Sequence, residues 1–183
     1  MQEVIATNGT PVVVVDRDGT IVRDYPDEQW ASVTTPEFLP GAVDGLRALQ
    51  AWGYGVVVVT NQYLIGEGVI SEQQYQDLAS QILDGLRAGG VEPLDVYHCP
   101  HPRSAACRCR KPGTALVERA LAEHPLLTLD GAFVVGDSDA DTGLAVNLGI
   151  PAICLGEVPP HPLVMRADGW DAVVGAVEQR LSH

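Results

Sequence analysis

Four consecutive valines at positions 12–15 constrain the fold more than any other feature of the sequence. A β-branched apolar run of this length indicates a strand that is buried on both faces, as in a parallel sheet covered by helices. The sequence Asp-Arg-Asp-Gly-Thr follows directly at positions 16–20, and Gly19 supplies a turn that lets the chain leave the sheet. The carboxylates of Asp16 and Asp18 are therefore expected at the C-terminal end of a strand, where open α/β sheets bind ligands.

Two later segments repeat this pattern of a buried strand followed by polar groups. Valines fill positions 56–59, and residues 133–135 are Phe-Val-Val. Because parallel strands end at one edge of a sheet, we expect the polar residues after these strands to lie near Asp16 and Asp18. The candidate residues are Thr60, Asn61, Asp137 and Asp141.

Lys111 is the only lysine in the chain, against ten arginines, and it stands between Arg110 and Pro112. Proline suits the first turn of a helix, so a helix is expected from Pro112 to about residue 123. Taken alone, Lys111 has the alternative of a solvated surface cation. Considered with the strand-end residues, the segment is interpreted as part of the same site, with Arg110 and Lys111 as candidates for binding phosphate.

Strand-like and helix-like segments alternate along the chain, which favours a parallel sheet with helices on both faces. We expect an α/β, Rossmann-like three-layer sandwich with a mainly parallel five-stranded sheet. Residues 21–40 have no clear periodicity and are expected to form a loop that helps to shape a pocket. The expected strands are residues 12–15, 56–59, 94–98, 132–135 and 152–155. The expected helices are residues 41–52, 72–87, 112–123 and 142–148, with a last one from residue 170.

The composition, 46% hydrophobic and 19% charged over 183 residues, suits one globular domain spanning residues 1–183. No apolar run approaches the roughly 20 residues of a membrane span, and the first residues do not resemble a signal peptide, so a soluble cytoplasmic protein without a membrane partner is expected. The net charge of −13 argues against nonspecific binding of a nucleic-acid backbone.

Residues 99–109 place three thiols and one imidazole close together. The four residues are Cys99, His101, Cys107 and Cys109. This ligand set fits a closed tetrahedral zinc site, which is structural because no coordination position is left for water. A disulfide is the alternative, and both the Cys-x-Cys spacing and a cytosolic setting disfavour it. Cys154 stands apart and is interpreted as a small buried apolar residue.

The strand-end residues suit phosphoryl transfer. A phosphate monoester is dianionic, so an attacking carboxylate is repelled unless cations neutralise the phosphoryl oxygens. Asp16 and Asp137 offer the hard oxygen ligands that Mg²⁺ prefers, while Lys111 offers a point charge and Thr60 a hydroxyl. The hypothesis is that Asp16 attacks phosphorus to form an aspartyl-phosphate, while Asp18 protonates the leaving alkoxide and then activates water.

The motifs Asp-x-Asp-Gly-Thr, Thr-Asn, Lys-Pro and Gly-Asp-x-x-x-Asp, in this order, resemble those of the haloacid dehalogenase superfamily over about residues 12–155. The resemblance implies that Asp16 is the nucleophile and that Asp18 is both the acid/base and a Mg²⁺ ligand through its backbone carbonyl. It also implies that Asp137 is a metal ligand and that Asp141 is a supporting carboxylate.

The cysteine cluster before Arg-Lys-Pro is similar to that of a narrower group, the D-glycero-D-manno-heptose 1,7-bisphosphate phosphatases and histidinol-phosphate phosphatases. This resemblance implies a small monomer with an open site and no separate cap domain, because in that group the zinc loop and other insertions near the site take the place of a cap. In the heptose enzymes Thr-Asn-Gln usually continues as Ser-Gly-Ile-x-Arg-Gly, whereas here Glu67 stands in place of the arginine. A carboxylate beside the pocket would disfavour a second phosphate and suit a cationic amine, unless Glu67 points away. Both substrates stay open.

Two other classes of function fit parts of the sequence. A phosphoacceptor module, such as a receiver-like domain, also uses strand-end aspartates and a lysine, but Thr60 and Asn61 with the paired aspartates favour a hydrolase. A zinc-stabilised interaction protein with a decayed active site is the other alternative, against which the four intact motifs argue. Catalytic turnover distinguishes a hydrolase from both alternatives.

Overall fold

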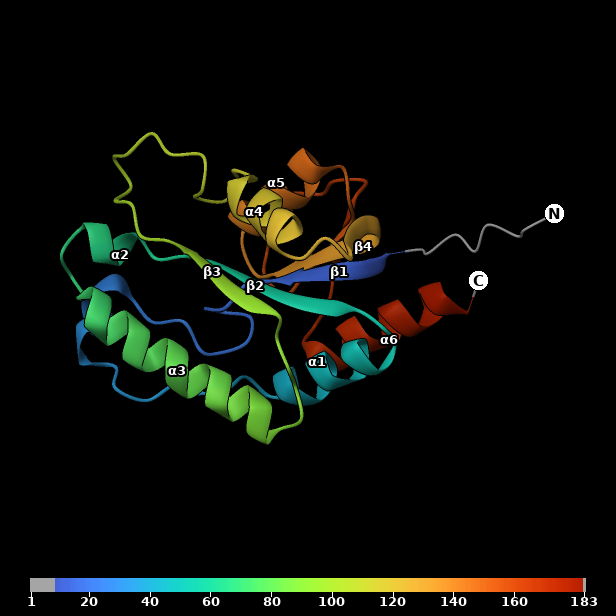
Figure 1. The fold of residues 1–183 in the computed structure, drawn as a ribbon, viewed down its shortest axis with the longest axis horizontal. Helices are drawn as coiled ribbons and strands as arrows, with labels where there is room; N and C mark the ends of the chain where they lie inside the picture. The colour runs from blue at the N-terminus through green and yellow to red at the C-terminus, as the bar shows by residue number, and fades with distance from the viewer. Residues whose placement is uncertain (1–8, 183) are drawn as a thin grey trace.

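The computed structural model describes residues 9–182, which form a six-stranded sheet with helices on both faces (Figure 1). The strand order is β3-β2-β1-β4-β5-β6, and each neighbouring pair is parallel. The strands are β1 (Thr10–Val15), β2 (Gly55–Asn61), β3 (Asp95–Cys99), β4 (Leu127–Gly136), β5 (Ala152–Cys154) and β6 (Val164–Arg166). Because β1 lies between β2 and β4, the residues that follow it reach the middle of the C-terminal edge of the sheet.

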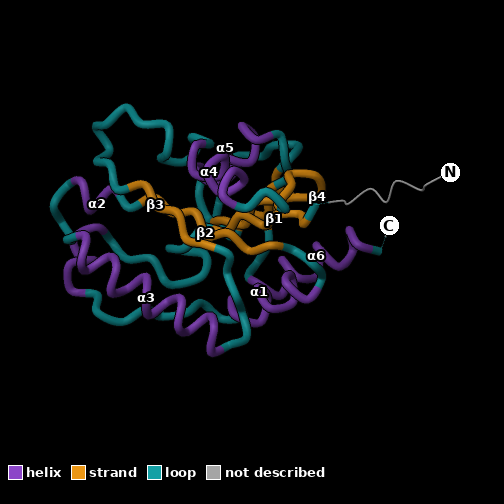
Figure 2. The backbone as a smooth tube through the Cα atoms, viewed as in Figure 1, coloured by secondary structure: helices purple, strands orange, loops and turns teal. Residues whose placement is uncertain are grey.

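The valines of β1 serve two separate cores, as a strand buried on both faces requires. Val13 and Val15 pack with side chains of α1 (Ala42–Ala51), α3 (Glu72–Ala88) and α6 (Trp170–Leu181). Val12 and Val14 pack on the opposite face with α4 (Ala115–Glu123) and α5 (Asp139–Leu148). Figure 2 shows this division of the helices between the two faces. Full burial contributes roughly 1.5–3 kcal/mol for each valine, which anchors the strand that carries Asp16.

The segment at residues 21–40, which was expected to be a loop, contains the 3₁₀ helix η1 (Asp27–Ser32). Trp30 from η1 packs against Leu64 of the short helix α2 (Tyr63–Gly66) and against Tyr75 and Leu78 of α3. This small third core fixes the segment beside the end of β1. Within residues 9–182, no helix has the length and apolar character needed to cross a membrane.

The predicted Rossmann-like architecture is confirmed, with one strand more than expected. β6 is a three-residue strand that pairs with β5, and its sequence Val-Met-Arg is too short to give a strand pattern. The helix predicted from Pro112 begins at Ala115, because residues 110–113 first form a turn in which the Gly113 N–H donates to the carbonyl of Arg110. The helix predicted from residue 142 begins at Asp139, since Ser138 caps it by donating to the Asp141 carboxylate.

Candidate active site

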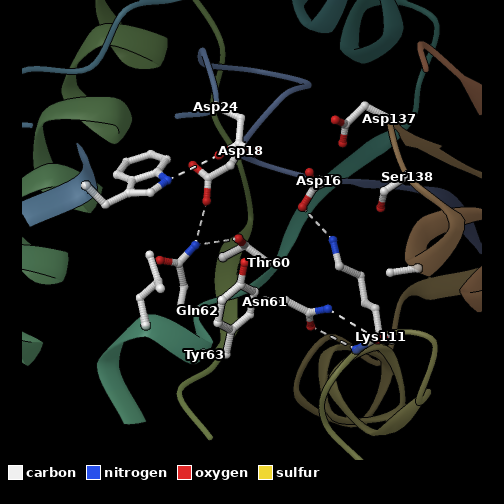
Figure 3. A pocket seen from close by; sticks show the side chains of 13 residues that line it. Asp16, Asp18, Asp24, Thr60, Asn61, Gln62, Tyr63, Lys111, Asp137 and Ser138 are labelled. Carbon is white, nitrogen blue, oxygen red and sulfur yellow. Dashed lines mark hydrogen bonds and ion pairs between the residues drawn. The ribbon is translucent and has the colours of Figure 1, made fainter. Parts of the chain in front are cut away.

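A cavity of about 250 Å³ opens at the C-terminal edge of the sheet, beyond β1, β2 and β4 (Figure 3). Segments that are far apart in the sequence supply its walls. The lining includes six of the predicted site residues, namely Asp16, Asp18, Thr60, Asn61, Lys111 and Asp137. The topology therefore brings together the residues for which the strand-end pattern predicted a common site.

Lys111 lies at the centre of the site and is 4% exposed. Its Nζ donates to Asp16 Oδ1 at 2.5 Å, to Asp141 Oδ1 at 2.7 Å and to the carbonyl of Val59 at 2.7 Å. Burial lowers the pKa of a lysine, but the charges of Asp141 and Asp16 outweigh this effect and raise the pKa of Lys111 above its ordinary value. Lys111 is therefore a buried cation at neutral pH, not a solvated one.

Asp16 follows β1, and its backbone N–H donates to the carbonyl of Val135, which holds it against β4. Burial raises the pKa of Asp16 well above its ordinary value. Lys111 opposes this shift, while the neighbouring carboxylates of Asp141 and Asp18 add to it. Asp16 is thus a buried carboxylate with one neighbouring cation and two acidic neighbours, so a further positive charge nearby would stabilise its ionised form.

Asp137 completes an acidic cluster that could bind such a cation. One carboxylate oxygen from each of Asp16, Asp137 and Asp141 lies within 4.8 Å of the others. Gly19 makes the approach possible, because its φ is +82° and a Cβ there would lie 2.1 Å from Asp137 Oδ2. Burial, followed by the charge of Asp141, raises the pKa of Asp137 to about 6. Clustered carboxylate oxygens of this kind are the donors that Mg²⁺ prefers.

Asp18 faces the same cavity from the opposite side, and two side chains that sequence reasoning did not select hold its carboxylate. Arg17 makes a two-point ion pair with it, from Nε to Oδ1 and from Nη2 to Oδ2, both at 2.8 Å. Gln62 Nε2 donates to Asp18 Oδ2 at 2.6 Å and to the Thr60 hydroxyl at 2.8 Å (Figure 3). The sequence pointed to Arg17 and Gln62 only through their positions, since each lies next to a predicted site residue.

Asn61 and Arg110 were both predicted to bind phosphate, and the structure gives each of them partners in the protein. The Asn61 side chain donates to the carbonyl of Lys111 and accepts from its backbone N–H, so it fixes the Lys111 segment. Arg110 donates to the carbonyls of Pro102 and Ala105 and does not line the cavity. These two contacts link Arg110 to the loop that precedes Lys111.

The outer wall of the cavity consists of Asp24, Trp30, Tyr63 and Leu64. Trp30 Nε1 donates to Asp24 Oδ1 at 3.2 Å, and burial raises the pKa of Asp24. The loop at residues 21–40 was expected to shape the pocket, but its lack of periodicity gave no means of selecting Asp24 and Trp30 in particular. Among the described residues that line the cavity, Lys111 is the only cation.

Glu67 does not line this cavity. It is paired with Arg103, which donates from Nε and Nη2 at 2.9 and 2.7 Å, and Arg103 Nη1 also reaches Asp27 at 3.0 Å. The guanidinium carbon of Arg103 lies 4.4 Å from the centre of the Tyr63 ring. The carboxylate that replaces the expected arginine therefore lies outside the cavity lining and is paired with Arg103 of a neighbouring loop.

The predicted zinc ligands converge at the end of β3. One ligand atom from each of Cys99, His101, Cys107 and Cys109 lies within 4.8 Å of the others. Cys99 Sγ lies 3.6 Å from Cys107 Sγ and 3.1 Å from Cys109 Sγ, while His101 Nδ1 lies 3.1 Å from Cys109 Sγ. Tetrahedral zinc with bonds of about 2.3 Å to sulfur separates two sulfurs by about 3.8 Å, so the cluster has suitable ligands at a suitable spacing. All four cysteines are free of disulfides.

Known proteins share both the sequence and the architecture. The chain matches the HAD-hydrolase-like family over residues 108–157. A Thermoplasma acidophilum protein named a probable D-glycero-D-manno-heptose-1,7-bisphosphate 7-phosphatase is 37% identical over 76% of this chain and 86% of its own. The histidine biosynthesis bifunctional protein HisB of Campylobacter jejuni is 32% identical over 80% of this chain, but the match spans only 42% of that longer protein.

The structure of D,D-heptose 1,7-bisphosphate phosphatase from B. bronchiseptica, complexed with magnesium and phosphate, has the same fold. Its TM-score is 0.79 over 93% of this chain and 99% of that one, with 22% sequence identity. The fold, the order of the motifs and the match to the T. acidophilum protein agree with one another. The chain belongs to the haloacid dehalogenase superfamily of hydrolases, in the group that includes heptose bisphosphate phosphatases and HisB proteins.

Proposed function

We propose that the protein is a Mg²⁺-dependent phosphatase that hydrolyses a small phosphorylated metabolite through an aspartyl-phosphate on Asp16. The observation that carries the proposal is the placement of Asp16 between the Lys111 ammonium and the carboxylate of Asp137, with Asp18 lining the same cavity. This arrangement supplies a nucleophile, positive charge for the phosphoryl oxygens and an acid/base group within one small space.

Asp16 and Asp137, with the backbone carbonyl of Asp18, are the proposed ligands of Mg²⁺. Asp141 has a supporting role, since it accepts a hydrogen bond from the Lys111 ammonium that also contacts Asp16. The acidic cluster fits the ion for two reasons. It gathers three carboxylates, which are hard oxygen donors, and among the described residues Lys111 is the one cation in contact with Asp16 and Asp141. Bound Mg²⁺ would neutralise charge on the phosphoryl oxygens. The protein's own contribution is to hold these carboxylates together at the ends of two adjacent strands.

The proposed reaction has two steps. A carboxylate oxygen of Asp16 attacks phosphorus, the bond from phosphorus to the ester oxygen breaks, and Asp18 gives its proton to the leaving alkoxide. Asp18, now a carboxylate, then takes a proton from water as the water oxygen attacks phosphorus. The bond from phosphorus to Asp16 breaks, inorganic phosphate leaves, and both aspartates are restored.

Two substrates agree with the relatives, histidinol phosphate and D-glycero-D-manno-heptose 1,7-bisphosphate. The outer wall favours the first, because Asp24 adds a carboxylate there and none of the described residues of that wall is a cation that could receive a second phosphate. The second is favoured by the name of the T. acidophilum relative. Both are esters of a primary alcohol at the phosphate to be removed, so the proposed chemistry is the same.

The test is phosphate release with Mg²⁺ from both compounds and from a panel of other phosphorylated sugars and amines. Selective turnover that disappears in Asp16→Asn would establish the reaction and its substrate together. If the panel instead labels Asp16 without releasing phosphate, the protein is a phosphoacceptor. Absence of both labelling and release would contradict the proposed function.

The raised pKa of Asp137 predicts a metal affinity that increases with pH. Because the folded-state pKa of about 6 lies above the ordinary value, protonation stabilises the metal-free folded protein at low pH, and this contribution is lost as pH rises through about 6. Mg²⁺ must displace that proton. We expect the increase in melting temperature caused by Mg²⁺ to grow between about pH 5 and pH 7. A pH-independent shift, or an unchanged shift in Asp137→Asn, would contradict this assignment.

We also propose that residues 99–109 form the zinc-binding loop of the hydrolase domain. Purified protein should contain stoichiometric zinc, and Cys109→Ser should lower both the zinc content and the melting temperature, because a structural zinc contributes directly to folding. Cys154→Ala is the matched control, since Cys154 lies in β5 and is not part of the cluster. Elemental analysis that found full zinc in Cys109→Ser would contradict this ligand set.

A further inference from the structure

Arg17 is a buried cation in the middle of the Asp-Arg-Asp motif, and the phosphatase chemistry proposed above does not use it. It is 2% exposed, and its guanidinium is paired with a carboxylate from one residue, Asp18. We propose that Arg17 is a positioning residue that holds the Asp18 carboxylate in the orientation needed for proton transfer to the leaving group. This inference rests on the proposed function, in which Asp18 is the acid/base.

The surroundings of Arg17 leave its guanidinium little freedom. Its guanidinium carbon lies 5.7 Å from the centre of the Trp30 ring and 5.2 Å from that of Tyr75. Both aromatic residues belong to the third core, beside Leu64 and Leu78. An apolar side chain could fill such a place without the cost of desolvating a charge, so packing alone does not account for an arginine here. The two-point ion pair with Asp18 accounts for the arginine.

The contacts fix both oxygens of Asp18. Arg17 donates to one oxygen from Nε and to the other from Nη2, and Gln62 Nε2 donates to the second oxygen as well. A two-point contact sets the plane of the carboxylate, which a single charge cannot do. Asp18 lines the cavity on its other side, so the held carboxylate lies between the guanidinium and the space for substrate. Arg17 stays protonated throughout, and Asp18 alone carries the transferred proton.

The dependence of kcat/KM on the leaving group tests this role. An alkoxide must be protonated as it leaves, whereas p-nitrophenolate departs without a proton. We would therefore compare p-nitrophenyl phosphate with the better of the two proposed alkyl esters in Arg17→Met and Arg17→Lys. Arg17→Lys keeps the charge and loses the two-point geometry, and it remains informative if Arg17→Met does not fold. Arg87→Met, on the exposed face of α3, is the matched control.

If Arg17 positions Asp18, both variants lose about 10- to 100-fold in kcat/KM on the alkyl ester and less than about threefold on p-nitrophenyl phosphate. Asp18→Asn should show the same selectivity more strongly. Equal losses on both esters would mean that Arg17 is structural only, and a parent-like Arg17→Lys would mean that charge suffices, so either result overturns the inference. If Asp18→Asn lacked the selectivity, the acid role of Asp18 and the inference would fail together, while Asp16→Asn tests the reaction separately.

Discussion

Replacing Asp16 by asparagine should lower phosphate release by at least about 10⁴-fold, because an amide cannot form the acyl-phosphate bond. The folded state should survive, since burial already makes the charged form of this side chain costly and Lys111 keeps its contact with Asp141. We expect a melting temperature no lower than that of the parent in the absence of metal. Phosphate assays and thermal unfolding on the same preparation measure both effects.

Asp139→Asn is the matched control for this experiment. Asp139 is exposed in the first turn of α5, two residues beyond Asp137, and it is not in the acidic cluster. The variant makes the same chemical change near the site and should keep the activity of the parent. Substantial turnover by Asp16→Asn, with asparagine confirmed by mass spectrometry, would assign the nucleophile to another residue.

Lys111→Met should cause the largest loss of stability of the substitutions considered. It leaves the carboxylates of Asp16 and Asp141 buried without their shared cation, at a cost of about 3–5 kcal/mol at neutral pH. Activity should fall by about 10²–10³-fold through the loss of charge stabilisation at the phosphoryl group. Denaturant unfolding without metal and phosphate release with Mg²⁺ measure the two effects.

The pH dependence and a second substitution show whether charge is the cause. Asp16 has a raised folded-state pKa, so its proton returns as pH falls, and the stability deficit of Lys111→Met should shrink toward acidic pH. Adding Asp141→Asn to Lys111→Met removes one of the unpaired charges and should recover part of the stability. A deficit that stays constant with pH and is unchanged in the double variant would point to lost packing instead.

The inner part of the site was predictable because its signals are local. A run of apolar β-branched residues identifies each central strand, the first polar residue after it lies at the edge, and parallel pairing brings those edges together. Asp16, Thr60 and Asp137 follow from this reasoning with no knowledge of distant contacts. β6 did not, because three residues give no periodicity and their pairing depends on β5 being in place.

The outer part could not be predicted because it depends on packing between distant segments. Arg17 is adjacent to two predicted residues, yet its aromatic neighbours Trp30 and Tyr75 come from η1 and α3, which lie far from it in the sequence. The surroundings of Glu67 could not be predicted for the same reason. Its charge was readable in the sequence, but its neutralisation by Arg103 required knowing that α2 lies beside the loop at 99–109.

The position of β1 between β2 and β4 also sets the order in which the protein can fold during synthesis. β2 and β3 both precede β4 in the chain, so the half-sheet β3-β2-β1 can pair first, but the other edge of β1 stays open until residues 127–136 emerge. An unpaired edge composed of valines readily pairs with strands of other chains. The pairing of β4 with β1 therefore covers both edges of the central strand and, in the same event, removes an apolar open edge from the nascent protein.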